Sequence, residues 1–315
     1  YNNFHHLVGH LRYLGQTKYM PGMRFRTSLE FAGLTHLTIK ALYPHGSDGV
    51  VFYPFVQAEY VSEPLLLNDL DKTIALYDDL HYNWSFGFGI WPNNATQLQL
   101  GIEQEQINIY PEIGMSGLPE WKHELVKMFA TFNIDHLDQV LIPSNGWKLT
   151  SSFELSSSII GSDIDYSRLE IMLKSYRQVS KKVNLGVQAY LGEAIGANSV
   201  NYLWFHTGGP DSFVGIDYYG LSWYRVANFR FDLRYELDND LYLKAIYNIA
   251  PNFTWRHAEK FYPLKDNAIQ GFGVGLLYDS ALGPIELIYS SGDNELDVEK
   301  HFQSRYLYLT AGVNF

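Results

Sequence analysis

Apolar and polar residues alternate with a period of two along most of this chain. From Asn228 to Leu237 the odd-numbered residues are apolar or aromatic, and the even-numbered residues are polar or charged. The same alternation recurs in residues 24–31, 147–155, 168–174 and 307–315. Because successive side chains of a β-strand point to opposite faces of a sheet, this pattern predicts strands with one apolar and one polar face.

Turn-forming residues separate the alternating blocks. The blocks are roughly 9–12 residues long, which is the length that a tilted strand needs to cross a lipid bilayer. The predicted turns are Pro44–Gly49, Pro92–Asn94, Pro143–Gly146, Leu237–Asp240 and Ser291–Asn294. We expect about fifteen strands on this pattern.

Two segments depart from the simple alternation. Residues 121–132 show some helical periodicity, and a strand fits them equally well. Residues 192–222 are rich in glycine, asparagine and aromatic residues and are predicted to form a large loop. No linker composition marks a domain boundary, so residues 1–315 are expected to form a single transmembrane β-barrel domain.

Two all-β architectures fit this pattern. In a soluble sandwich or barrel the apolar faces form the core, whereas in a membrane barrel they face lipid and the polar faces line the lumen. The polar faces carry both charge signs, as Arg230, Asp232 and Arg234 illustrate, which suits a wet lumen crossed by ion pairs. The chain also ends on an apolar residue, Phe315, where soluble proteins commonly have a polar tail. Both features favour the membrane barrel.

Composition supports a membrane crossing made by strands. Aromatic residues make up 16% of the chain, and Tyr and Trp favour membrane–water interfaces. No apolar run approaches the roughly 18–20 residues that a spanning helix needs. The net charge of −11 argues against a nucleic-acid partner, because phosphate binding needs a basic surface. The chain starts at Tyr1 without a signal peptide, so we expect it to be a piece of a longer protein.

No recognisable catalytic or metal site appears in the sequence. The chain has no cysteine, which excludes disulfides, thiolate zinc sites and a cysteine nucleophile. The run Gly114-Met115-Ser116-Gly117 has the wrong spacing for a hydrolase nucleophile elbow, and Asp48-Gly49 is expected to be a turn. The weaker candidates for a metal site are the histidines His5, His6 and His10, which we interpret as ordinary surface or lumen residues. The acidic run Asp293, Glu295, Asp297 and Glu299 is interpreted as a solvated loop rather than as an extracellular divalent-cation site. We expect no cofactor, no metal and no enzymatic activity in this chain.

Four short segments carry a family resemblance. The first is Asp135-His136-Leu137-Asp138 followed by Pro143 to Trp147, with Gly146 before the tryptophan. The second is Phe205 to Gly209, containing Gly208 and Gly209, followed by Phe213-Val214-Gly215-Ile216. The third is Gly271 to Tyr289, and the fourth is the terminal Gly312-Val313-Asn314-Phe315. Together they resemble the Omp85 superfamily, also called the bacterial surface antigen family, over residues 126–315.

This resemblance implies a transmembrane antiparallel barrel of sixteen strands with a long loop folded into its lumen. The second segment is similar to the loop motif, and five strands are expected to follow it. The first segment resembles a hairpin between two barrel strands. The terminal residues Gly312, Val313 and Phe315 resemble the signal that the barrel-assembly machinery recognises during biogenesis. Trp204, Trp223, Tyr218 and Tyr219 are expected either to form an aromatic girdle or to pack the loop.

The loop motif departs from the family pattern at its charged pair. The family loop carries an arginine where this chain has Val214, and the facing strand carries an acid and a glycine where this chain has Asn248 and Ala250. A buried half-pair would cost several kcal/mol, so the loss of both charges together is physically coherent. The departure weakens the expectation of a protein-insertion or translocation role.

Within the superfamily, the first two segments resemble most the patatin-like outer-membrane phospholipases, in which a lipase precedes a barrel of this type. We therefore expect the chain to anchor, and to help deliver, an N-terminal lipase passenger in the bacterial outer membrane. One alternative is an assembly or translocation pore of the same superfamily. Another is a stand-alone channel or scaffold subunit. The expected partners are outer-membrane lipid, the barrel-assembly machinery, and a homo-oligomer or larger membrane complex.

Overall fold

The computed structural model of the chain describes eleven stretches of the sequence. These are residues 9–16, 22–31, 35–46, 49–69, 72–113, 118–196, 203–216, 221–251, 268–281, 283–293 and 304–311. Several predictions concern residues outside them, namely those on His5, His6, Asp48, 114–117, Tyr218, Tyr219, Glu295, Asp297, Glu299, Gly312, Val313 and Phe315. The chain divides into two compact units, of which unit 1 lies within residues 1–132 and 154–166 and unit 2 within residues 133–153 and 167–313.

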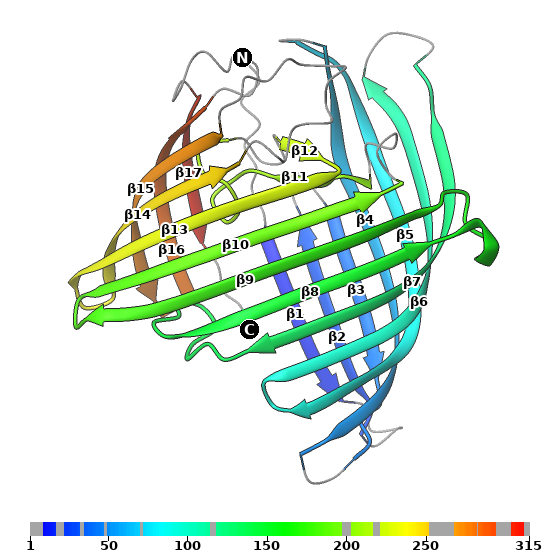
Figure 1. Ribbon diagram of the computed structural model, residues 1–315, viewed down its shortest axis with the longest axis horizontal. Helices are drawn as coiled ribbons and strands as arrows, with labels where there is room; N and C mark the ends of the chain where they lie inside the picture. Colours follow the sequence, from blue (N-terminus) through cyan, green and yellow to red (C-terminus); the bar gives the residue numbers. More distant parts are fainter. Residues whose placement is uncertain are drawn as a thin grey trace. The chain divides into compact units, whose positions relative to one another are not determined.

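Unit 1 is built from antiparallel strands, of which β4, β5 and β6 are long (Figure 1). They are β1 (Gly9–Gln16), β2 (Arg24–Phe31), β3 (Thr35–Leu42), β4 (Val51–Asp69), β5 (Lys72–Asn93), β6 (Thr96–Ile113) and most of β7 (Trp121–Asp135). Strands β4, β5 and β6 contain 19, 22 and 18 residues, well beyond the predicted length. The strand alternative for residues 121–132 is confirmed, because they form part of β7.

Unit 2 consists of antiparallel strands and one inserted strand pair. Its strands are most of β8 (Gly146–Ser156) and β9 (Tyr166–Ser180), then β10 (Val183–Ile195), β13 (Arg225–Asp238), β14 (Leu241–Ala250), β15 (Ile269–Ser280), β16 (Gly283–Gly292) and β17 (Ser304–Ala311). The inserted pair is β11 (Phe205–Thr207) and β12 (Leu221–Trp223). The predicted loop of residues 192–222 is therefore wrong at its ends: β10 continues to Ile195, and the inserted pair occupies part of the remainder.

In the described stretches the main sheet has fifteen strands in the order of the sequence, with β10 directly beside β13. Five described strands follow the inserted pair, which agrees with the number that the resemblance implied. Within the described residues the sheet order runs from β1 to β17 with no pairing between these two strands, so sixteen strands in a closed barrel stay a prediction. No helix in the described stretches has the length and apolar character needed to cross a membrane.

The predicted alternation is confirmed on the strands of unit 2. In β13, Phe231, Leu233 and Tyr235 are exposed, whereas Arg230 and Asp232 are buried. The register pairs Arg230 with Asn248 and Asp232 with Ile246 across β13 and β14, which places Asn248 and Ile246 on the same face as the buried charges. In unit 2 the sheet therefore exposes the apolar residues of one face and buries the polar residues of the other, and we call these the outward and inward faces. This arrangement is the reverse of a soluble sandwich, whose core is apolar.

Candidate functional site: a loop seated on the polar face of unit 2

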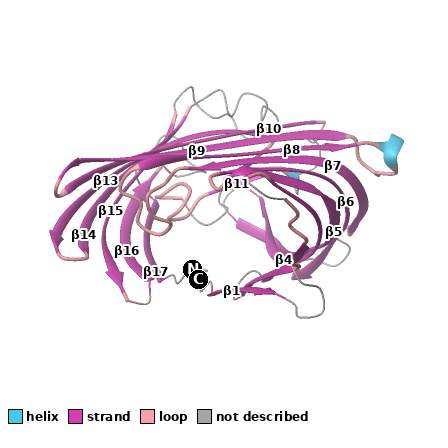
Figure 2. Ribbon diagram, turned by 90° about the horizontal axis from the view of Figure 1, so that it is seen from below, coloured by secondary structure: helices cyan, strands magenta, loops and turns pink. Residues whose placement is uncertain are grey.

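Residues 208–216, which follow β11, fold onto the polar face of β13–β17 (Figure 2). We call residues 208–216 the seated loop. Its two ends are joined by a hydrogen bond from the Gly209 N–H to the Ile216 carbonyl at 3.1 Å. The hydroxyls of Thr207 and Ser212 lie 2.5 Å apart. These two contacts close the loop on itself, independently of its contacts with the strands.

Neutral amide and hydroxyl groups bind the centre of the seated loop. The side-chain oxygen of Asn248 accepts from the Val214 N–H at 3.2 Å, and its amide nitrogen donates to the Ser212 carbonyl at 3.0 Å. The Gly215 N–H donates to Ser290 Oγ at 3.2 Å. Because Asn248 is fully buried, these bonds satisfy both ends of an amide that would be costly to leave unpaired.

Three further groups on the strands hold the flanks of the loop. Asn228 on β13 donates to the Ser212 carbonyl at 3.2 Å, next to the bond from Asn248. The Tyr308 hydroxyl on β17 donates to the Ile216 carbonyl at 2.7 Å. The Arg230 guanidinium on β13 donates to the Pro210 carbonyl. An arginine therefore does contact the loop, but it comes from the strand rather than from the loop motif.

Apolar side chains of the loop enter two small clusters on the same face. Val214 packs with Ile246, Ile288 and Tyr308, and all four are buried. Phe213 and Ile216 pack with Ala250 and Ile269. The side chain at the position of the family arginine thus occupies an apolar seat, and Asn248 contacts the backbone of Val214.

Glycines let the loop backbone lie directly on the strands. A Cβ built on Gly271 of β15 would lie 1.9 Å from the Val214 carbonyl oxygen. A Cβ on Gly292 of β16 would lie 2.4 Å from the Gly215 carbonyl oxygen. Gly215 itself has φ of 82°, in the region that favours glycine. Backbone atoms cannot move aside as a flexible side chain can, so these positions require glycine.

A compensated charge network surrounds the Arg230 contact. Arg230 lies 2.9 Å from Asp232, and Lys244 lies 3.8 Å from Asp232 and 2.5 Å from Glu286. Buried charges remain tolerable only when each has a partner, and here two cations face two carboxylates. The ion pairs predicted for the polar face are present in this network.

The predicted hairpin motif forms the connection between β7 and β8 within unit 2. Both carboxylate oxygens of Asp138 accept backbone hydrogen bonds, from the N–H groups of Ser144 at 2.9 Å and Asn145 at 3.0 Å. Burial acts to raise the pKa of Asp138, but these N–H groups outweigh it and hold that pKa below its ordinary value. Arg234 of β13 donates to the Pro143 carbonyl. Gly146 has φ of 105°, as the turn requires.

Replacement of Asp138 by alanine is expected to destabilise this hairpin by about 1 kcal/mol. The variant lacks the exposed carboxylate that accepts the two backbone hydrogen bonds. The depressed pKa means that this stability is present above the ordinary carboxyl pKa and is lost as the pH falls through the lowered value. Urea unfolding of the Asp138→Ala and parent proteins across this range measures the effect. A difference between the two that stays constant at acid pH would contradict the assignment.

Asp135, at the end of β7, also holds the hairpin by its side chain. Asp135 accepts from Lys148 at 2.8 Å and from the Leu137 N–H at 3.1 Å. Trp204 stacks on Trp223 with ring centroids 6.2 Å apart, which matches the interpretation that these aromatics pack the loop segment. Within the described stretches no cluster of histidine, aspartate or glutamate has the arrangement of a metal site.

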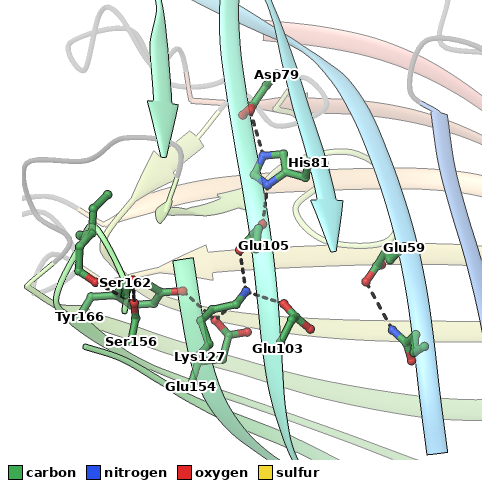
Figure 3. Close-up of polar contacts among 12 residues, drawn as sticks. Glu59, Asp79, His81, Glu103, Glu105, Lys127, Glu154, Ser156, Ser162 and Tyr166 are labelled. Carbon is green, nitrogen blue, oxygen red and sulfur yellow. Dashed lines mark hydrogen bonds and ion pairs between the residues drawn. The ribbon is translucent and has the colours of Figure 1, made fainter. Parts of the chain in front are cut away.

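Unit 1 carries a second charged network that sequence inspection missed (Figure 3). His81 on β5 lies 2.9 Å from Asp79 and 2.6 Å from Glu105 of β6. Lys127 on β7 lies 2.7 Å from both Glu103 and Glu105. These residues occupy the polar positions of their strands, so the alternation placed them on this face without predicting their contacts. The network joins three neighbouring strands by opposite charges.

An antiparallel sheet with exposed apolar side chains on one face and a loop seated on its polar face has the arrangement of a membrane β-barrel. A family model described as the Omp85 superfamily domain matches residues 72–304. The chain therefore belongs to the Omp85 superfamily. The matched residues include the seated loop and its contacts on β13–β16.

Solved structures share this fold at low sequence identity. BamA from Haemophilus ducreyi lacking POTRA domains 1–3 is 14% identical with a TM-score of 0.71, over 92% of this chain and 64% of that chain. CdiB from Acinetobacter baumannii is 7% identical with a TM-score of 0.57, over 90% and 53%. CdiB from Escherichia coli is 13% identical with a TM-score of 0.54, over 91% and 55%. This chain thus spans less than two thirds of each, and no curated protein matched it.

Proposed function

We propose that the chain is a bacterial outer-membrane barrel that inserts or translocates polypeptide and catalyses no reaction itself. The observation that carries this proposal is the seated loop, which lies inside the residues matched by the Omp85 superfamily domain. The likeness in fold to BamA and CdiB adds support. Side chains of the strands bind the backbone of the seated loop on the inward polar face. The outward face therefore stays free to meet lipid.

The outward face supports the membrane location. Large apolar side chains stay exposed along it, including Phe88 on β5 and Leu307 and Leu309 on β17. Apolar surface on this scale is unfavourable in water and favourable in hydrocarbon. Outer-membrane lipid is therefore the natural partner of this face, and a barrel-assembly machinery would be needed to insert it.

The test is the folding of a client protein. Liposomes that contain the purified chain are mixed with an urea-unfolded small outer-membrane barrel, whose folding is followed by its shift in gel migration without heating. We expect faster folding than in empty liposomes. A rate equal to that of empty liposomes, with the chain correctly folded, would contradict the insertion activity.

A second candidate function is the anchoring of an N-terminal passenger. The neutral seat of Val214 and Asn248 favours it, because the charged pair of the family loop is absent. A patatin-like lipase is the passenger suggested by the sequence motifs. The intact mass of the protein extracted from native membranes distinguishes the two candidates. A mass near 36.2 kDa would eliminate the passenger, and a much larger mass would call for lipase assays.

A further inference from the structure

The turn between β8 and β9 exposes two neighbouring isoleucines. Ile159 is 93% exposed and Ile160 is 36% exposed, both within the short helical turn η1 (Ser158–Ile160). In Figure 2 this turn, drawn as the cyan helix at the right, stands clear of the strands. A single exposed apolar side chain is ordinary on a protein surface, so the setting of the pair decides its meaning.

The turn holds its isoleucines in a fixed conformation. Ser157 Oγ accepts from the Ile159 N–H at 3.3 Å, and Asp165 accepts from the Ser158 N–H at 2.5 Å and from its hydroxyl at 3.1 Å. Gly161 ends the turn with φ of 98°. Because these bonds have already ordered the turn, burying the isoleucines in another medium would cost little further backbone entropy.

The turn lies at the edge of the apolar outward face of β7. The Asp163 N–H donates to the Glu124 carbonyl at 2.9 Å, and the Glu124 N–H donates to the Asp163 carboxylate at 2.7 Å. A Cβ on Gly161 would lie 3.9 Å from Val126 Cγ2. On this face of β7 the exposed polar side chains end at Glu124, and the apolar ones begin at Val126 and continue with Met128. The turn that carries the isoleucines therefore lies beside the place where the exposed apolar side chains of β7 begin.

We propose that Ile159 and Ile160 form an interfacial anchor that inserts into the hydrocarbon edge of the lipid bilayer beside Val126. The inference rests on the membrane location in the proposed function. An apolar pair on a rigid polar turn matches the chemistry of the interface, where hydrocarbon meets the hydrated headgroups. Its effect is to fix the depth at which the adjoining end of β7 sits in the membrane.

The absence of cysteine from the chain allows a single-site test. Ile159→Cys is labelled with an environment-sensitive fluorophore in the full chain, folded in vesicles of phosphatidylcholine. Met128→Cys, among the exposed apolar residues of β7, is the lipid control. Lys122→Cys, among the exposed polar residues at the start of the same face of β7, is the water control. Quenching by a nitroxide on the lipid chain is compared with quenching by iodide in the buffer.

We expect the label at 159 to emit at shorter wavelength than the label at 122 and to be quenched by the lipid nitroxide as the label at 128 is. If 128 reports lipid while 159 is quenched by iodide as 122 is, the anchor is refuted and the membrane barrel stands. If 128 also reports water, the membrane location itself fails. Ile159 is almost wholly exposed, so its replacement leaves the folded core intact.

Discussion

Gly271→Ala is expected to lift the seated loop from the strands and to lower the free energy of unfolding by about 3 kcal/mol. The added Cβ would lie 1.9 Å from the Val214 carbonyl oxygen, and neither backbone can move aside without breaking other contacts. The bond from the Val214 N–H to Asn248 lies beside this contact and would be stretched first. Urea unfolding of the chain in lipid vesicles measures the loss.

Gly273→Ala is the matched control for this substitution. It lies on the same strand and the same face, and its nearest neighbour would be Ile288 Cγ2 at 3.2 Å. That atom belongs to a side chain that can shift by a few tenths of an ångström, so we expect a loss of about 1 kcal/mol or less. Equal losses for both variants would show that replacing any glycine of this strand is destabilising. The close approach of the loop backbone would then not account for the effect.

Val214→Arg is expected to cost about 3–5 kcal/mol, because it places a cation without a partner among buried groups. Ile246, Ile288 and Tyr308 surround the site, and Asn248 offers no charge. Val214→Met is the control, since it brings a similarly long side chain without charge. A comparable unfolding free energy for the arginine and methionine variants would mean that the arginine side chain reaches water. It would contradict the claim that residue 214 must pack in the apolar cluster.

The double variant Val214→Arg with Asn248→Asp tests whether the family pair can be restored. Asn248→Asp alone is destabilising, because its carboxylate would face the Ser212 carbonyl and the side-chain oxygen of Asn228. A favourable coupling energy in the double-mutant cycle indicates that the two charges meet. We expect a coupling smaller than the sum of the two single losses, since the apolar cluster around Val214 persists in the double variant.

The period-two pattern predicted the parts of the fold that depend on nearest neighbours in sequence. It placed Arg230 and Asp232 on the inward face and Phe231 and Leu233 on the outward face, which the structure confirms. It underestimated the length of β5, because the alternation continues through the whole strand and marks no end in the sequence. It treated residues 192–222 as one loop because glycine and asparagine mask the short β11–β12 pair.

The seat of the loop could not be predicted because its partners are distant in the sequence. Arg230, Asn248 and Tyr308 bind loop carbonyls 20, 36 and 92 residues away, and only the register of the folded sheet brings them together. One signal was available in the chain. Gly271 and Gly273 fall on inward positions of β15, where a strand without side chains leaves room for another backbone.

The most direct test of the central claim is a photo-cross-link from the loop in native outer membranes. A diazirine-bearing aliphatic residue is placed at Ile216, and the linked peptides are identified by mass spectrometry. The same residue at Val140, which is exposed on the β7–β8 connection, is the control. The seated loop predicts internal links from position 216 to the peptides that contain Ala250 or Ile269, and none of these from position 140. Links from position 216 to lipid or to other proteins, without the internal links, would contradict it.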